Sequence, residues 1–183
     1  PICILDLVVD TKETQENIVD YYGKREVLYL GPDENVTPAD INWIIKQAGR
    51  RGYETPAAFM SSKPRAGINH KEYGVTSEGV NVFLDVALQR VLGIDPRKES
   101  FTVKMTGGTN GDVAGNMLKF LHRDYNGNAK IVGIADGTAT AEDPDGLCME
   151  ELIRMVYEDE PISAYNPDKL GPRGKFLEAI TPE

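Results

Sequence analysis

The sequence predicts an α/β protein in which helices cover a largely parallel sheet. The main observation is that short apolar runs, typical of buried strands, alternate along the chain with segments whose apolar residues recur at helical spacing. Such alternation favours a parallel sheet, because the crossover between parallel strands is usually a helix. The length of 183 residues suits one domain, or one domain and part of another. Hydrophobic residues at 40% and charged residues at 27% exclude a disordered or fibrous chain.

The N-terminal part of the chain contains two apolar runs and two helical segments. Ile2–Val9 is almost continuously apolar, which predicts a strand buried on both faces. We expect a short helix around Lys12–Tyr22 and a second strand at Glu26–Leu30. Thr37-Pro38-Ala39-Asp40 predicts the start of a longer helix, with an N-cap hydroxyl, a proline in the first helical position and an acid in the first turn. Its inward face is expected to consist of Ile41, Ile44, Ile45 and Ala48.

The rest of the chain alternates between helices and strands after one irregular stretch. No periodicity marks Arg51–Val75, so this stretch is either a linker or a functional loop. A helical stripe ended by Gly93 follows, and it consists of Val80, Phe83, Leu84, Ala87, Leu88, Val91 and Leu92. The pattern then predicts strands at Phe101–Thr106 and Ala129–Ala135 and helices at Asp112–His122 and Met149–Tyr157. Pro161–Glu183 shows no readable pattern.

Composition and residue spacing exclude several classes of function. The net charge of −9 opposes binding to the phosphate backbone of nucleic acid. No apolar run approaches the roughly 18 residues that a membrane-spanning helix needs. Neither the two cysteines, Cys3 and Cys148, nor the two histidines, His70 and His122, stand at the spacing of a metal or redox motif. We therefore expect no metal, no nucleic acid and no membrane partner, and we expect a cytoplasmic location.

The segment Phe101–Gly115 is the strongest candidate for chemistry, because an expected strand leads into a glycine-rich turn and a helix follows at once. Glycines in such a turn let the backbone approach a pyrophosphate, whose charge the free N–H groups of the helix N-terminus stabilise. The spacing G-x-G-x-x-G/A is met only in its second half, by Gly111–Ala114, while Thr109 stands where the first glycine would fall. A Walker A loop is excluded, since no Lys-Ser/Thr follows the glycines. By itself the pattern also fits a glycine-rich turn that binds nothing.

Asp136 ends the next expected strand and adds to the evidence for a nucleotide site. A carboxylate at that position accepts hydrogen bonds from an adenosine ribose and repels a 2′-phosphate. No basic residue follows it in Gly137-Thr138-Ala139-Thr140, which favours NAD over NADP. The alternative is that Asp136 only caps the turn after the strand. The turn, the helix and the acid together favour nucleotide binding.

Several motifs resemble, in the same order along the chain, those of the large NAD-specific glutamate dehydrogenases. They extend from about Glu26 to Val156 and are Tyr29-Leu-Gly-Pro-Asp-Glu-Asn35, Phe59-Met-Ser-Ser-Lys-Pro64, Gly67-Ile-Asn-His-Lys-Glu-Tyr-Gly-Val-Thr-Ser-Glu-Gly-Val80, Lys104-Met-Thr-Gly-Gly-Thr-Asn-Gly-Asp-Val-Ala-Gly-Asn116 and Asp143-Pro-Asp-Gly-Leu147. The resemblance implies a Rossmann-like, doubly wound, mostly parallel sheet with helices on both faces. It also implies a homo-oligomeric parent enzyme that deaminates L-glutamate to 2-oxoglutarate and ammonia, with NAD as cofactor.

The resemblance further implies roles for individual residues. Asp33 matches an aspartate that the family places between the two lobes of its active site as a proton carrier. Thr76 matches a threonine that reaches the nicotinamide amide, and Asp136 matches the acid that binds the ribose. The turn over the cofactor pyrophosphate is implied to comprise Gly108, Thr109, Asn110, Gly111, Asp112 and Val113.

The resemblance divides the chain into two functional parts. Residues 1–70 match the end of a substrate-binding, catalytic lobe with the interlobe segment, and residues 71–183 match the NAD-binding lobe. The family's catalytic lysine segment has no counterpart here, and the chain begins at Pro1 rather than Met. We therefore expect a portion of a longer enzyme that binds NAD but is inactive alone. Two alternatives stay open: a non-catalytic nucleotide-sensing or assembly module, and a doubly wound domain that binds nothing.

Overall fold

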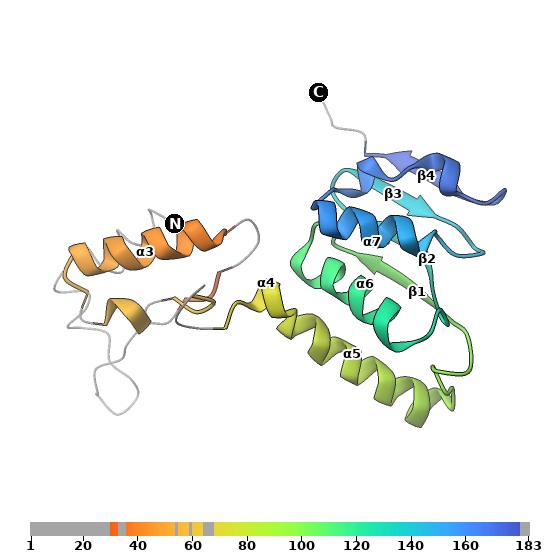
Figure 1. Cartoon of the computed structure of the whole chain (residues 1–183), viewed down its shortest axis with the longest axis horizontal. Helices are drawn as coiled ribbons and strands as arrows, with labels where there is room; N and C mark the ends of the chain where they lie inside the picture. Colours follow the sequence, from red (N-terminus) through yellow and green to blue (C-terminus); the bar gives the residue numbers. More distant parts are fainter. Residues whose placement is uncertain (1–29, 33–35, 54, 59, 64–67, 180–183) are drawn as a thin grey trace. The chain divides into compact units, whose positions relative to one another are not determined.

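The computed structural model describes residues 30–32, 36–53, 55–58, 60–63 and 68–179. The chain forms two compact units, Pro1–Tyr73 and Gly74–Glu183, and each is described by itself (Figure 1). The strand expected at Ile2–Val9 and the helix expected at Lys12–Tyr22 lie outside the described residues. The assignment of residues 1–70 and 71–183 to two functional lobes stays a prediction.

The first unit is built around helix α3, Pro38–Arg50. The Thr37 hydroxyl accepts a hydrogen bond from the Asp40 N–H at 3.3 Å, and the Asp40 carboxylate accepts one from the Thr37 N–H at 2.8 Å. This reciprocal pair is the capping box that a Thr-x-x-acid pattern favours. The expected helix start is therefore confirmed, and its buried side chains, packed with Met60, are Ile41, Ile44 and Ala48.

Short elements fill the rest of the first unit. Leu30, at the end of the expected strand Glu26–Leu30, forms an isolated parallel bridge with Met60, and the Ser61 N–H donates to the Leu30 carbonyl at 2.9 Å. The stretch expected to be irregular contains a 3-10 turn, η1, at Pro56–Ala58 and a one-turn helix, α4, at His70–Tyr73. The other residues of the Glu26–Leu30 strand lie outside the described residues.

The second unit contains a four-stranded sheet in the order β1-β2-β3-β4. The strands are β1, Phe101–Thr106; β2, Ala129–Ala135; β3, Ala139–Glu142; and β4, Lys175–Glu178. Strands β1 and β2 match the two expected strands and pair in parallel, whereas β2 with β3 and β3 with β4 pair antiparallel. The α/β class is confirmed, but the sheet is mixed rather than mostly parallel. The reason is the short connection between β2 and β3, since a parallel return needs a crossover of a dozen or more residues.

Two helices lie side by side over the sheet, and the hydrophobic core lies between them and the strands. Helices α6, Asp112–Asp124, and α7, Met149–Glu158, cover one face of the sheet (Figure 1). The sequence had led us to expect helices on both faces. Tyr125 is fully buried and meets the Phe101 ring edge-on at 5.3 Å. The other large side chains with full burial are Leu118, Leu121, Ile131, Ile134, Leu152, Met155, Ile162 and Tyr165.

Helix α5, Val75–Ala87, continues into a π-helical turn, η2, at Leu88–Leu92 and ends at Gly93, whose φ is 69°. The expected helix is confirmed, and most of its apolar stripe is exposed. Phe83 and Val91 are 79% and 78% exposed, whereas Ser77, Asn81 and Leu88 are buried.

The partner of α5 explains which of its faces is buried, because α5 packs against α6 through polar contacts. The Ser77 hydroxyl donates to the Val113 carbonyl at 2.8 Å. Asn81 donates to the Asp124 carboxylate at 2.8 Å and accepts from the Tyr125 hydroxyl at 2.9 Å. These bonds satisfy the buried polar groups and turn the apolar side of α5 outward.

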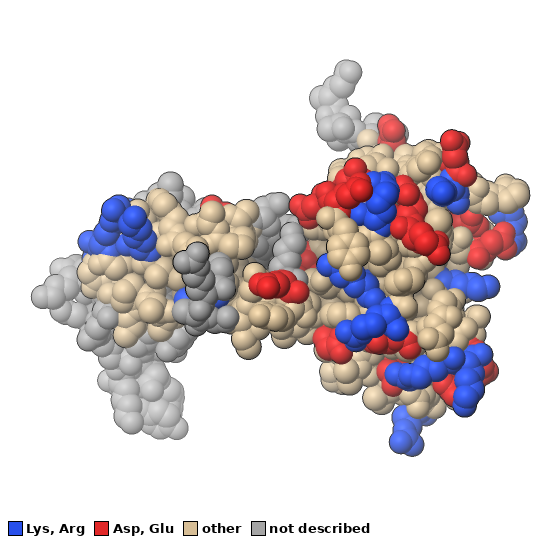
Figure 2. All heavy atoms as spheres, viewed as in Figure 1, with Lys and Arg blue, Asp and Glu red and all other residues tan. Residues whose placement is uncertain are grey.

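Charge is spread over the second unit in both signs. Figure 2 shows acidic and basic side chains interleaved on the visible face, rather than a single block of either sign. Among the described residues, no helix combines the length and the apolar character that crossing a bilayer requires.

Candidate functional site

The glycine-rich turn joins the end of β1 to the start of α6. Its backbone needs glycine at two places, because Gly107 and Gly108 have φ values of 114° and 71°, which side chains other than glycine rarely adopt. The Gly107 N–H donates to the carbonyl of Ala135 at 2.9 Å. The turn is therefore tied to the carboxyl ends of both β1 and β2, the edge at which open α/β sheets bind ligands.

Two further glycines are required by close backbone approach. A Cβ atom on Gly111 would overlap the carbonyl oxygen of Gly107, and one on Gly115 would overlap that of Thr109. The turn thus folds back on itself and packs directly on the first turns of α6. This is the arrangement in which a pyrophosphate reaches backbone N–H groups, and the residues present fit such a group.

Helix α6 begins without a side-chain cap on its first N–H groups. Gly111 is the N-cap, in extended backbone with φ −72° and ψ 142°. Asp112 occupies the first turn, where its carboxylate accepts from the Asn116 side chain at 3.2 Å. Val113 is 43% exposed, and Asn110 is exposed as well. The positive end of the helix dipole therefore faces the turn, which favours an anion there.

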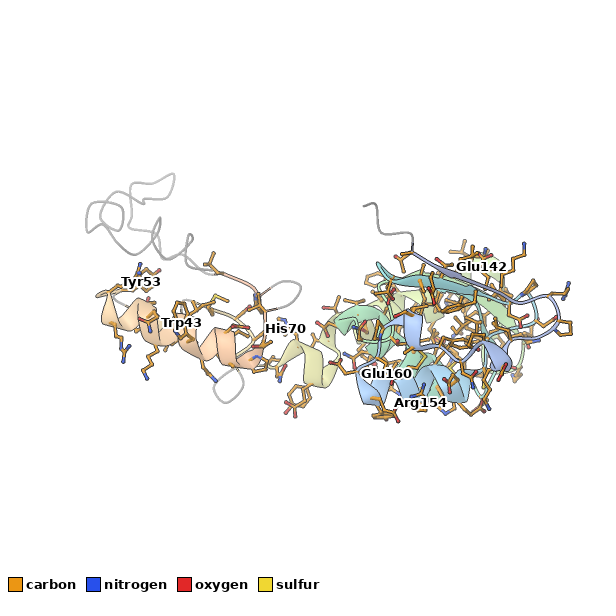
Figure 3. All side chains as sticks on the ribbon, turned by 90° about the horizontal axis from the view of Figure 1, so that it is seen from above. Trp43, Tyr53, His70, Glu142, Arg154 and Glu160 are labelled. Carbon is orange, nitrogen blue, oxygen red and sulfur yellow. The ribbon has the colours of Figure 1, made fainter. Side chains whose placement is uncertain are left out.

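Thr109 has a structural role that its sequence position did not reveal. It is 1% exposed, and its hydroxyl donates to the backbone carbonyl of Glu160, just beyond α7. Figure 3 shows Glu160 beside Arg154 of α7, and their side chains form an ion pair at 2.8 Å. The turn over α6 is thus joined to the segment that follows α7.

Asp136 follows β2 and lies against the glycine-rich turn. A Cβ atom on Gly108 would be 2.6 Å from Asp136 Oδ2, so this oxygen faces the turn. Asp136 Oδ1 accepts hydrogen bonds from the N–H and hydroxyl of Thr138, at 2.7 and 2.6 Å, and from the Ala139 N–H at 3.1 Å. Asp136 Oδ2 accepts from the Ile162 N–H at 2.8 Å.

The environment of Asp136 keeps the carboxylate ionised. Burial would raise its pKa, but the hydrogen bonds from Ile162, Thr138 and Ala139 stabilise the charged form and hold the pKa below its ordinary value. At neutral pH the turn therefore faces a negative charge. Sequence reasoning missed Thr138 and Ile162. An Asp-x-Thr pattern could have revealed the first, whereas no sequence signal links Asp136 to Ile162.

Of the two remaining residues expected at the site, Thr76 is described by the structure and Asp33 is not. Thr76 is exposed in the first turn of α5, and its neighbour Ser77 bonds to the Val113 carbonyl, so this end of α5 lies beside the first turn of α6. Asp33 lies outside the described residues. In the described part of the chain, no group of three or more His, Cys, Asp or Glu side chains gathers to hold a metal ion.

A strand, a glycine-rich turn, an uncapped helix N-terminus and an acid at the end of the next strand are together typical of dinucleotide-binding α/β folds. A sequence profile of the Glutamate/Leucine/Phenylalanine/Valine dehydrogenases matches residues 66–179, and the chain belongs to this family. The resemblance to the large NAD-specific glutamate dehydrogenases is thereby confirmed, with relatives that cover almost the whole chain.

Two curated relatives illustrate the similarity. The chain is 34% identical to a probable NAD-specific glutamate dehydrogenase of Schizosaccharomyces pombe over 93% of its own length and 15% of the relative's. It is also 34% identical to glutamate dehydrogenase 2 of Dictyostelium discoideum, over 96% of its own length and 16% of the relative's. The chain thus spans only a small part of these enzymes.

Solved structures show the same fold. The chain is similar to the crystal structure of Plasmodium falciparum glutamate dehydrogenase, with a TM-score of 0.53 and 19% identity over 82% of this chain and 31% of that one. It is also similar to the hetero-hexameric glutamate dehydrogenase of Thermus thermophilus, with a TM-score of 0.50 and 21% identity over 73% of this chain and 30% of that one. The Rossmann-like relationship expected from the sequence is confirmed.

Proposed function

We propose that the Gly74–Glu183 unit binds NAD as the nucleotide-binding lobe of a glutamate dehydrogenase. The observation that supports NAD binding most strongly is that three features lie together at one edge of the sheet. They are the glycine-rich turn, the N-terminus of α6 and the ionised carboxylate of Asp136, whose Oδ2 atom faces Gly108. The parent reaction is oxidative deamination of L-glutamate to 2-oxoglutarate and ammonia, by a homo-oligomer.

The chain's own residues would hold the cofactor in two places. The N–H groups of Asp112 and Val113 would receive the pyrophosphate beside Gly111, whose own N–H donates to the Gly108 carbonyl at 3.4 Å. The helix dipole would add to the attraction. Asp136 would accept a ribose hydroxyl, and its charge would repel the 2′-phosphate of NADP. Thr76, beside the first turn of α6, is the proposed contact to the nicotinamide amide. Bound NAD would supply the hydride acceptor, which no side chain can be.

The catalytic part of the proposal concerns residues beyond the described site. Asp33 is the proposed proton carrier, a role that requires its carboxyl to exchange protons near neutral pH. The lysine segment that the family uses has no match in this sequence. We therefore propose that the 183-residue chain binds NAD but does not oxidise glutamate. The cytoplasmic location inferred from the cysteines stays a prediction.

The test is calorimetric titration of the chain with NAD and NADP. We expect NAD to bind more tightly than NADP, and we expect Asp136→Ala to narrow the gap between the two affinities. Gly111→Ala should abolish binding, because the added Cβ would overlap the Gly107 carbonyl. The matched control is Gly79→Ala, at a helical glycine with nothing within 4 Å, which should bind NAD normally.

The outcomes separate the competing functions. Equal affinities for NAD and NADP in the unmodified chain would contradict the role of Asp136. If the chain binds neither nucleotide, the result would favour the alternative of a doubly wound domain that has no ligand. Formation of NADH from glutamate by the purified chain would show that it is active after all. A full-length parent that binds NAD but does not oxidise glutamate would favour a nucleotide-sensing or assembly module.

A further inference from the structure

The turn that follows α7 is held at the edge of the proposed nucleotide site by residues of the β2–β3 connection and of the glycine-rich turn. This turn, Pro161–Ala164, includes the 3-10 element η3, Ile162–Ala164. The Ile162 N–H donates to Asp136 Oδ2 at 2.8 Å, and the Ser163 N–H donates to the Thr138 hydroxyl oxygen at 3.1 Å. From the glycine-rich turn, the Thr109 hydroxyl donates to the Glu160 carbonyl immediately before it.

The two oxygens of Asp136 are used unequally. Oδ1 already accepts three donors, from the Thr138 N–H, the Thr138 hydroxyl and the Ala139 N–H. Oδ2 accepts one donor, the Ile162 N–H. Each oxygen of an ionised carboxylate offers about two acceptor positions. The oxygen with room for one more donor is therefore Oδ2, which is also the one that faces Gly108.

The Thr138 hydroxyl is the one side-chain donor among the described hydrogen bonds to the Asp136 carboxylate. It gives its proton to Oδ1, at 2.6 Å, so its oxygen is left to accept the Ser163 N–H. One hydroxyl thus fixes both the carboxylate and the Pro161–Ala164 turn. Without it, Oδ1 would keep only its two backbone donors and the Ser163 N–H would lose its acceptor, so the carboxylate and the turn would be held less firmly.

We propose that Thr138 is a positioning residue for nucleotide binding. It holds Asp136 so that Oδ2 receives one ribose hydroxyl and the Ile162 N–H together. The bound ribose is thereby coupled to the Pro161–Ala164 turn, which forms a wall of the site. This inference rests on the proposed binding of NAD and adds to it a residue that does not itself touch the nucleotide.

The experiment measures the Kd of the 183-residue chain for NAD and for the NAD analogue that lacks the 2′-hydroxyl on its adenosine ribose. We expect Thr138→Val to raise the Kd for NAD by about tenfold, the loss that one charge-assisted hydrogen bond produces. The Kd for the 2′-deoxy analogue should stay unchanged, since it has no hydroxyl to offer to Oδ2. Thr138→Ser, which keeps the hydroxyl, should restore tight binding. Thr102→Val, at an exposed position of β1, is the matched control and should change neither Kd.

The results distinguish this inference from the function on which it rests. If Thr138→Val raises the Kd for NAD and the Kd for the 2′-deoxy analogue by the same factor, the role of Thr138 is only structural. That result would overturn the inference, although the proposal that the chain binds NAD would stand. If the unmodified chain binds neither nucleotide, the proposed function and the inference fall together.

Amide hydrogen exchange gives a second, independent readout. NAD should slow exchange of the Ile162 N–H in the unmodified chain, and the 2′-deoxy analogue should slow it less. Bound NAD that leaves exchange at Ile162 unchanged would contradict the coupling between the ribose and the turn.

Discussion

The charge of Asp136 joins two segments of the second unit. Its carboxylate accepts hydrogen bonds from the β2–β3 connection and from the turn after α7. Either set of hydrogen bonds alone would be an ordinary contact within or between loops. Because both converge on one ionised group beside the glycine-rich turn, the same residue supports local structure and the proposed ribose site. Substitutions of Asp136 should therefore affect stability and binding together, and pH separates the two effects.

We predict that Asp136 contributes pH-dependent stability. Its pKa lies below the ordinary value of 3.8 in the folded chain, so the folded state favours the ionised form. The contribution is complete above that ordinary value and is lost as the pH falls through the lower, folded value. Asp136→Asn should therefore unfold at a lower temperature than the unmodified chain at pH 7, and the gap should shrink below about pH 4. A gap that stays constant from pH 7 to pH 3 would contradict this prediction.

Helix α5 shows how a partner element selects the buried face of a helix. Its apolar side chains outnumber its polar ones, but the buried positions include Ser77 and Asn81 because α6 offers hydrogen-bond partners there. The Asn81 side chain bridges the Asp124 carboxylate and the Tyr125 hydroxyl, both from the C-terminal end of α6. The contact between α5 and α6 is thus specified by a polar pair rather than by shape alone.

We predict that Asn81→Ala lowers the free energy of unfolding by about 1–3 kcal/mol, because it leaves the buried Tyr125 hydroxyl without its main acceptor. Tyr125→Phe should be less damaging, since it removes the hydroxyl together with its need for a partner. Denaturant unfolding of the two single variants and the double variant measures the coupling. The double variant should lose less than the sum of the single losses, and strictly additive losses would show that the two side chains act independently.

At the scale of the whole molecule, α5 and η2 expose a series of large apolar side chains on the second unit. Its members are Val75, Val80, Val82, Phe83, Val86, Val91 and Leu92.

We predict that this surface binds a hydrophobic dye in the folded chain. Phe83→Ser should lower the fluorescence of bound anilinonaphthalene sulfonate and leave the thermal midpoint unchanged, because Phe83 is 79% exposed. Leu88→Ser, at a 5% exposed position on the buried side, should lower the midpoint and serves as the contrast. A Phe83→Ser variant that unfolds at a clearly lower temperature would show that this face is covered in solution.

The sequence by itself determined the local features of this protein. The strand, glycine-rich turn and helix at Phe101–Gly115 follow from residue types next to one another, and so does the capping box that starts α3. The order of short motifs also sufficed to indicate the family. Such features depend on near neighbours and on backbone preferences, which a single sequence displays directly.

The tertiary structure alone decided the features that depend on distant partners. Strands β3 and β4 are only four residues each, and β4 exists because Lys175–Glu178 pairs with a strand far earlier in the chain. The buried face of α5 and the link from Asp136 to Ile162 likewise depend on which elements meet. No local pattern records these contacts, because a polar side chain is buried only where folding brings it a hydrogen-bond partner.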